Sequence, residues 1–143
     1  MSYVEKSLGE NEELKHRFGF HWVINFNIYG FHLLMLLFVL TFYSSLGLLT
    51  ALLLIPSVIY HLSIKNTEHA VTSKRVIFKT GIIARKTEEQ MLPKVETVEV
   101  SQGILGRMFG YGDIKVTGTG SSFVLFKGID DPIDVKKKIE SLL

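Results

Sequence analysis

Charged and uncharged positions divide the chain into unlike parts. Residues 18–64 contain no Asp, Glu, Lys or Arg, so the last charge before this stretch is Arg17 and the first after it is Lys65. A small globular domain would have to bury nearly all of so long an uncharged segment. After Lys65 charged residues return at short intervals, and apolar residues alternate with polar ones as they do in strands.

Two apolar runs lie within the uncharged stretch, at about residues 20–43 and 46–64. Each approaches the roughly 20 mainly apolar residues that span a bilayer. Residues 44–47 (SSLG) between them suit a tight turn. Since a helix satisfies its own backbone hydrogen bonds in hydrocarbon, the pattern predicts a transmembrane helical hairpin.

The flanking charges predict the orientation of this hairpin. Lys15, Arg17 and Lys65 lie beside its open side, whereas the turn at residues 44–47 carries no charge. Lys and Arg near membrane ends favour the cytoplasmic side. We therefore expect a multi-pass protein with both termini in the cytoplasm.

Polar residues inside the two runs have two interpretations. Asn25, Asn27, His32 and His61 are the side chains concerned, and Pro56 interrupts the second run. Intramembrane polar groups often mark an ion or proton path. They also form ordinary hydrogen bonds to a neighbouring helix or to headgroups, at about 1 kcal/mol each. The second interpretation is preferred because the runs contain no carboxylate.

The part after Lys65 predicts six strands and a short helix. Alternation of β-branched or aromatic residues with polar ones marks the strands, and glycine-rich turns separate several of them. Residues 104, 105, 108 and 109 have helical spacing, so the short helix is placed within 102–110. The six strands are expected at residues 68–72, 75–80, 82–92, 97–100, 113–117 and 122–127.

A final helix is predicted from residue 131 onward. Asp131 suits the N-cap, and Pro132 suits the first helical position, where a missing N–H is not needed. Asp134 favours the helix start through the helix dipole. An apolar stripe at i, i+4, i+7 and i+8 is expected to pack on the sheet. The stripe consists of Val135, Ile139, Leu142 and Leu143.

Several motifs in this part stand in the order of a known family. The chain resembles bacterial pleckstrin-homology (PH) domain proteins of the type with two N-terminal transmembrane helices. The residues that carry the resemblance are 71–77 (VTSKRVI), 79–81 (KTG), 92–96 (LPKVE), 98–102 (VEVSQ), 105–107 (LGR), 110–112 (GYG), 118–120 (GTG), Phe126, Ile129 and 131–132 (DP), together with the leader 3–8 (YVEKSL).

The resemblance implies a PH-like fold of seven strands in two sheets, with a C-terminal helix closing one end. Six strands are counted, so the seventh is expected within residues 91–101. The fold class is then an α+β membrane protein: a cytoplasmic segment at 1–17, a transmembrane hairpin at 18–64 and a PH-like antiparallel sandwich or barrel at 65–143. We therefore expect the protein to be located in the bacterial cytoplasmic (inner) membrane.

Composition limits the chemistry. The 143-residue chain has no cysteine and a net charge of only +2, which does not indicate nucleic-acid binding. No nucleophile with a base, carboxylate pair or metal cluster stands out, so we predict no enzyme activity, no cofactor and no metal. The best catalytic grouping would join His21 or His61 to Glu68, which is weak. His69 is interpreted as a surface strand residue, and Arg107 as a buried partner of Glu96 or Glu99.

Three functions remain open. The preferred one is a noncatalytic membrane-anchored PH-like module that binds an unidentified protein partner or further copies of itself. The others are a sensor of anionic lipid headgroups in the bilayer and a small oligomeric transport or channel subunit. Lipid contact is assigned to Lys65, Lys74, Arg75, Lys79, Arg85 and Lys86. A homo-oligomer interface is assigned to Asn25, Asn27, Gly47 and Ala51.

Overall fold

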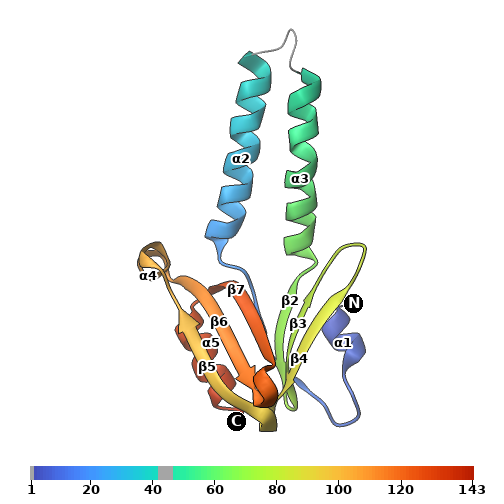
Figure 1. Cartoon of the computed structure of the whole chain (residues 1–143), viewed down its shortest axis with the longest axis vertical. Coiled ribbons are helices and arrows are strands. Elements are labelled where there is room, and N and C mark those ends of the chain that lie inside the picture. Colours follow the sequence, from blue (N-terminus) through green and yellow to red (C-terminus); the bar gives the residue numbers. More distant parts are fainter. Residues whose placement is uncertain (1, 42–46) are drawn as a thin grey trace.

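The computed structural model describes residues 2–41 and 47–143, without side-chain detail at 27, 28, 39, 41, 47–54, 57 and 121. Two antiparallel sheets form a sandwich, and a pair of long helices projects away from it (Figure 1). The predicted turn at residues 44–47 lies largely outside the described residues.

The first sheet has four strands in the order β1-β2-β3-β4, each antiparallel to its neighbours. They are β1 (Leu14–Phe18), β2 (Glu68–Thr72), β3 (Arg75–Thr80) and β4 (Lys86–Met91). Strand β1 lies outside residues 65–143, the range expected from sequence to form the domain. The seventh strand was therefore wrongly expected within residues 91–101.

The second sheet has three antiparallel strands in the order β5-β6-β7. They are β5 (Val95–Ser101), β6 (Tyr111–Gly118) and β7 (Phe123–Asp130), with 3₁₀ turns η1 (Leu92–Lys94) before β5 and η2 (Thr119–Ser121) before β7. Helix α4 (Ile104–Phe109) connects β5 to β6. All six strands predicted from alternation, and the short helix, are confirmed.

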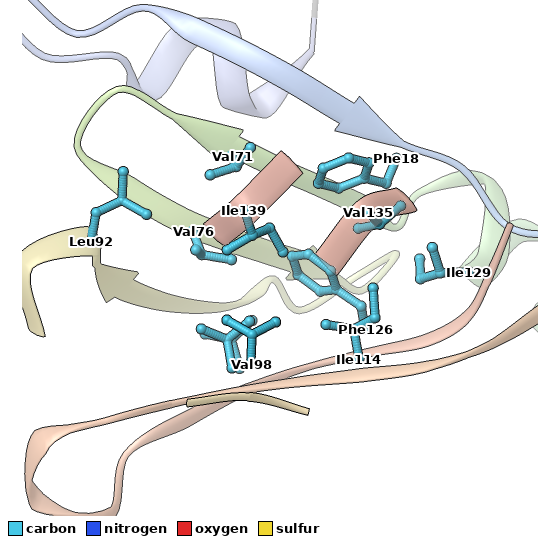
Figure 2. Close-up of a cluster of buried hydrophobic side chains, with 12 residues drawn as sticks. Phe18, Val71, Val76, Leu92, Val98, Ile114, Phe126, Ile129, Val135 and Ile139 are labelled. Atoms are coloured by element: carbon cyan, nitrogen blue, oxygen red, sulfur yellow. The ribbon is translucent and has the colours of Figure 1, made fainter. Parts of the chain in front are cut away.

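The C-terminal helix α5 (Pro132–Glu140) closes the core. Asp131 caps it by accepting a hydrogen bond from the Asp134 backbone N–H at 3.2 Å, as predicted. Val135 and Ile139 are buried with Phe126 and Val76, one from each sheet (Figure 2). The predicted stripe packs as expected except for Leu143, which is exposed.

The outer face of the first sheet is covered by helix α1 (Tyr3–Ser7). Val4 is fully buried against Ala70 of β2 and Ile77 of β3. Glu68 binds this helix: its carboxylate accepts from the Ser2 hydroxyl and from the backbone N–H of Tyr3 at 3.1 Å and Val4 at 3.3 Å. Both faces of β2 are consequently buried.

Helices α2 (Trp22–Thr41) and α3 (Gly47–Lys65) lie side by side (Figure 1). In sequence they are inserted between β1 and β2. The two strands nevertheless pair directly, with Phe18 opposite His69. The helical pair is thus an insertion within one sheet and does not precede an independent domain in sequence.

The expected transmembrane hairpin is wrong. Among the described residues, no helix is both long enough and apolar enough to cross a membrane. The multi-pass location in the bacterial inner membrane, with both termini cytoplasmic, is overturned with it. The prediction rested on the absence of charge and on the length of the two apolar runs. Phe18 nevertheless belongs to a strand, His21 is buried at the sandwich, and polar side chains such as Asn25, His32 and His61 interrupt the helices.

Candidate ligand cavity

A cavity of about 480 Å³ lies where the helical pair meets the sandwich. Its walls come from both helices, from β2, β3 and β4 of the first sheet, and from β7 of the second. Aromatic and branched apolar side chains dominate the lining. The lining residues are Phe20, Ile24, Tyr60, Ser63, Ile64, Thr67, His69, Phe78, Lys86, Glu88, Phe123, Leu125 and Lys127.

The alternation of β7 explains how one strand serves both the core and the cavity. Val124 and Phe126 are buried in the core, while Phe123, Leu125 and Lys127 occupy the opposite face and line the cavity. Successive side chains of a strand point to opposite faces. The cavity therefore adjoins the hydrophobic core without being part of it.

His69 lies beneath the cavity in an aromatic cluster. Its ring is 4.8 Å from Phe20 and 4.9 Å from Phe126, both edge-on, and stacks on Phe78 at 5.3 Å between centroids. Only 1% of the residue is exposed, and Nε2 has no hydrogen-bond partner within the described part of the chain. The interpretation of His69 as a surface residue is wrong.

Burial keeps this imidazole neutral. It lowers the pKa of His69 to about 4, and a hydrogen bond with the Phe18 backbone opposes the shift only in part. A buried cation would lose its hydration without a compensating charge among the surrounding phenylalanines. The floor of the cavity is thus uncharged at neutral pH.

The charges of the cavity are carried by Lys86, Glu88 and Lys127. Lys86 and Glu88 form an ion pair of 2.7 Å with each other. Lys127 is exposed and takes part in none of the ion pairs found among the described residues. The lining consequently has one uncompensated positive charge.

His21 joins α2 to the second sheet. Its backbone N–H donates to the Gly128 carbonyl at 2.9 Å, and its Nδ1 accepts from the Val23 backbone N–H at 3.2 Å. The ring is buried next to Tyr111, and Nε2 lies 3.6 Å from Asp130 Oδ1. The suggested catalytic grouping of His21 or His61 with Glu68 therefore does not form: Glu68 binds α1, and His61 lies on α3 near Tyr29.

Gly128 has a φ of +60°, a left-handed conformation that glycine adopts at little cost. A Cβ at this position would lie only 2.4 Å from Ile24 Cδ1. The positive φ therefore favours glycine here, and the Ile24 side chain of α2 would have to move to admit a Cβ.

A second polar cluster ties the N-terminal segment to the first sheet. Arg75 forms ion pairs with Glu12 at 2.8 Å and with Glu89 at 2.7 Å, and donates to the Ser7 carbonyl at 2.6 Å. Burial raises the pKa of Glu12, but hydrogen bonds from Gly9, Thr72 and Arg75 and the Arg75 charge outweigh it, so the pKa lies below its usual value. Arg75 is therefore a structural residue of this junction.

The six residues assigned to lipid contact do not form one surface. Lys74 lies in the β2–β3 turn and Arg75 begins β3, so both are at the other end of this strand from Lys79. Lys79 is largely buried and donates to the Asn66 carbonyl at 2.6 Å. Lys65 ends α3, Arg85 lies over the Tyr3 ring, and Lys86 pairs with Glu88 at the cavity.

The residues assigned to an oligomer interface all belong to the helical pair. Asn25 is half-buried on α2. Asn27, Gly47 and Ala51 have helical backbones, and the side chains of Asn27 and Ala51 lie outside the described part. Arg107, expected to be buried, is exposed on α4.

Sequence reasoning missed the cavity and its histidine. The available signal was local: His69 occupies the same strand face as Val71, and the next strand, at residues 75–80, is mainly apolar and contains Phe78. Phe20 and Ile24 gave no such signal, because their assignment to a membrane helix hid their contact with β7.

The four-stranded and three-stranded sheets, closed by α5, define a PH-type sandwich. The family model described as Bacterial PH domain matches residues 24–142, which include nearly all of the helical pair. The chain therefore belongs to the bacterial PH domain family. No curated protein shows significant similarity to it. No solved structure does so either.

Proposed function

We propose that the chain is a noncatalytic PH-like interaction module that assembles with further copies of itself through α2 and α3. The observation that carries this proposal is the exposure of large apolar side chains along both helices. Phe26, Leu34 and Leu40 of α2 are each more than 60% exposed, and Ile55 and Ile59 of α3 are both 54% exposed. An apolar surface of this extent favours a binding partner that covers it.

A second copy suits this surface better than a partner of different composition. Residues 22–64 carry no charge, so identical helices meet without repulsion between like charges. Symmetric association would bury the same apolar faces on both copies. The helices project from the sandwich, which leaves room for such packing (Figure 1).

The lipid-headgroup sensor has less support. Its six basic residues are divided between the two ends of the first sheet, and Arg75, Lys79 and Lys86 are already paired with protein groups. The alternative of a transport or channel subunit required membrane-spanning helices, and the described residues contain none.

Molar mass in mild detergent, corrected for the bound detergent, tests self-assembly. We expect the full chain to be an oligomer. Replacing Leu36 and Leu40 with Glu should lower the mass toward the monomer, because charges would have to be buried without partners. The matched control is Ile83→Glu, at a fully exposed apolar position in the β3–β4 loop, which should leave the mass unchanged.

The polar residues of α2 give a second variant. Changing Asn25 and Asn27 to Leu should weaken the oligomer if these amides form hydrogen bonds between copies. A monomer at all concentrations would refute the proposal. An oligomer that survives the two Glu substitutions would show that α2 is not the interface.

A further inference from the structure

The cavity at the junction of helices and sandwich has three properties of a small-molecule site. Its volume of about 480 Å³ lies within the roughly 300–1,000 Å³ typical of such sites. Its lining is mainly apolar. Its one uncompensated charge, at Lys127, gives it a polar end.

We propose that this cavity binds an amphiphile with one apolar chain and one anionic end, of the medium-chain fatty-acid class. The apolar chain packs against Phe20, Phe78 and Leu125, and the carboxylate binds Lys127. All the walls of this site come from a single chain, so the proposal does not rest on self-assembly.

The distribution of charge places the anionic end at Lys127. His69, on the floor, is neutral and surrounded by three phenylalanines, so the floor offers an anion no countercharge. Lys86 is compensated by Glu88 at 2.7 Å. Lys127 is exposed on β7, where a carboxylate can stay partly hydrated while it contacts the ammonium group.

The apolar walls come from elements that the fold holds together. Ile24 is placed by the close approach of α2 to Gly128, and Phe20 by its bridge to Ile129. Phe78 stacks on the buried His69 ring. Walls held by backbone pairing and core contacts lose little freedom when a ligand binds, which favours affinity.

The experiment uses the full chain, kept in an amphipathic polymer so that no detergent monomers compete. A decanoate carrying a photoreactive diazirine is crosslinked, and labelled residues are mapped by mass spectrometry. We expect saturable labels on cavity residues, displaced by unlabelled decanoate. Labels confined to the exposed faces of α2 and α3 would overturn the proposal.

Two variants test the apolar part. Leu125→Trp fills the cavity from β7 and Ser63→Trp fills it from α3, and each should reduce labelling at least tenfold. Two positions on different elements are used so that misfolding of one variant does not decide the result. Undiminished labelling in a folded variant of either kind would overturn the site.

A matched pair of lysines tests the charged part. Lys127→Gln should weaken displacement by decanoate about fivefold, the upper range for an exposed ion pair. Lys137→Gln removes the same charge from the exposed face of α5 and should have no effect. Decanol, which has no charge, should displace the probe equally from both variants. Equal effects of the two lysines on decanoate would overturn the role of Lys127.

Discussion

His69 is the residue whose surroundings differ most from its expected place. It was assigned to a strand surface, but Phe20, Phe78 and Phe126 enclose its ring. A partly polar side chain in such a site is stable only in its neutral form. The residue therefore couples protonation to folding.

We predict that stability falls between pH 6.5 and 4 because of His69. The pKa of His69 is about 4 in the folded chain, whereas an unperturbed histidine, as in the unfolded chain, has a pKa of 6.5. The unfolded chain therefore binds more protons in this pH window. The free energy of unfolding should fall by about 3 kcal/mol once the pH is below both pKa values. Chemical denaturation at several pH values measures it.

The His69→Phe variant should flatten the pH dependence above pH 5, where His69 titrates in the unfolded chain but the shifted carboxylates still contribute little. Phe78→Leu is the control, because it removes packing from the same ring without removing a titratable group. It should lower stability at every pH and keep the slope. A wild-type slope in His69→Phe would contradict the assignment.

Arg75 shows how one buried ion pair differs from an exposed one. Arg75→Met should destabilise the fold by about 3 kcal/mol, because it leaves the largely buried Glu12 carboxylate without its charged partner. Lys138→Met removes the exposed i,i+4 pair with Asp134 and should cost no more than about 0.5 kcal/mol. Urea unfolding of both variants at neutral pH makes the comparison, and equal losses would contradict it.

At the scale of elements, α4 and β6 are joined by a close backbone approach. A Cβ on Gly106 would lie 2.6 Å from the Tyr111 carbonyl oxygen, whereas one on Gly103, at the start of the same helix, would meet nothing within 4 Å. The glycine in the helix is thus required by packing, and the glycine at its start is not.

We predict that Gly106→Ala costs about 1–3 kcal/mol, because α4 must shift away from β6. Gly103→Ala should change stability by less than about 0.5 kcal/mol. The shift in the midpoint of urea unfolding measures both. A similar loss in the two variants would show that the close approach is not the cause.

For the whole molecule, the decisive feature is that the helical pair is inserted within the first sheet. Strand β1 precedes the helices in sequence and β2 follows them, yet the two pair along their length. Phe18 of β1 belongs to the same core as Val71, Phe126 and Ile139. The sandwich is therefore incomplete without the residues before the helices.

We predict that a fragment of residues 65–143, the domain expected from sequence, lacks cooperative thermal unfolding. This fragment would expose the edge of β2, and each of two buried clusters would lose a residue, Phe18 from one and Val4 from the other. Replacing a single buried Phe with Ala already lowers the free energy of unfolding by about 3–5 kcal/mol. Circular dichroism on heating compares it with the full chain. A fragment as stable as the full chain would contradict the role of β1.

Sequence by itself determined the elements whose causes are local. Alternation predicted β2 to β7, the Asp131-Pro132 start and the apolar stripe predicted α5, and the ordered motifs indicated the bacterial PH family. These signals depend on neighbouring residues in the chain, so no partner has to be known to read them.

The tertiary structure alone decided β1, the helical insertion, the neutral His69 and the cavity. Each depends on contacts across some fifty residues, such as Phe18 opposite His69. The uncharged stretch 18–64 indicated that its apolar side chains must be removed from water. It did not indicate which surface would cover them. Because hydrophobic burial is non-directional, apolar residues such as Phe20 and Ile24 suit a membrane, a core or a ligand cavity equally well until the fold places β7 beside them.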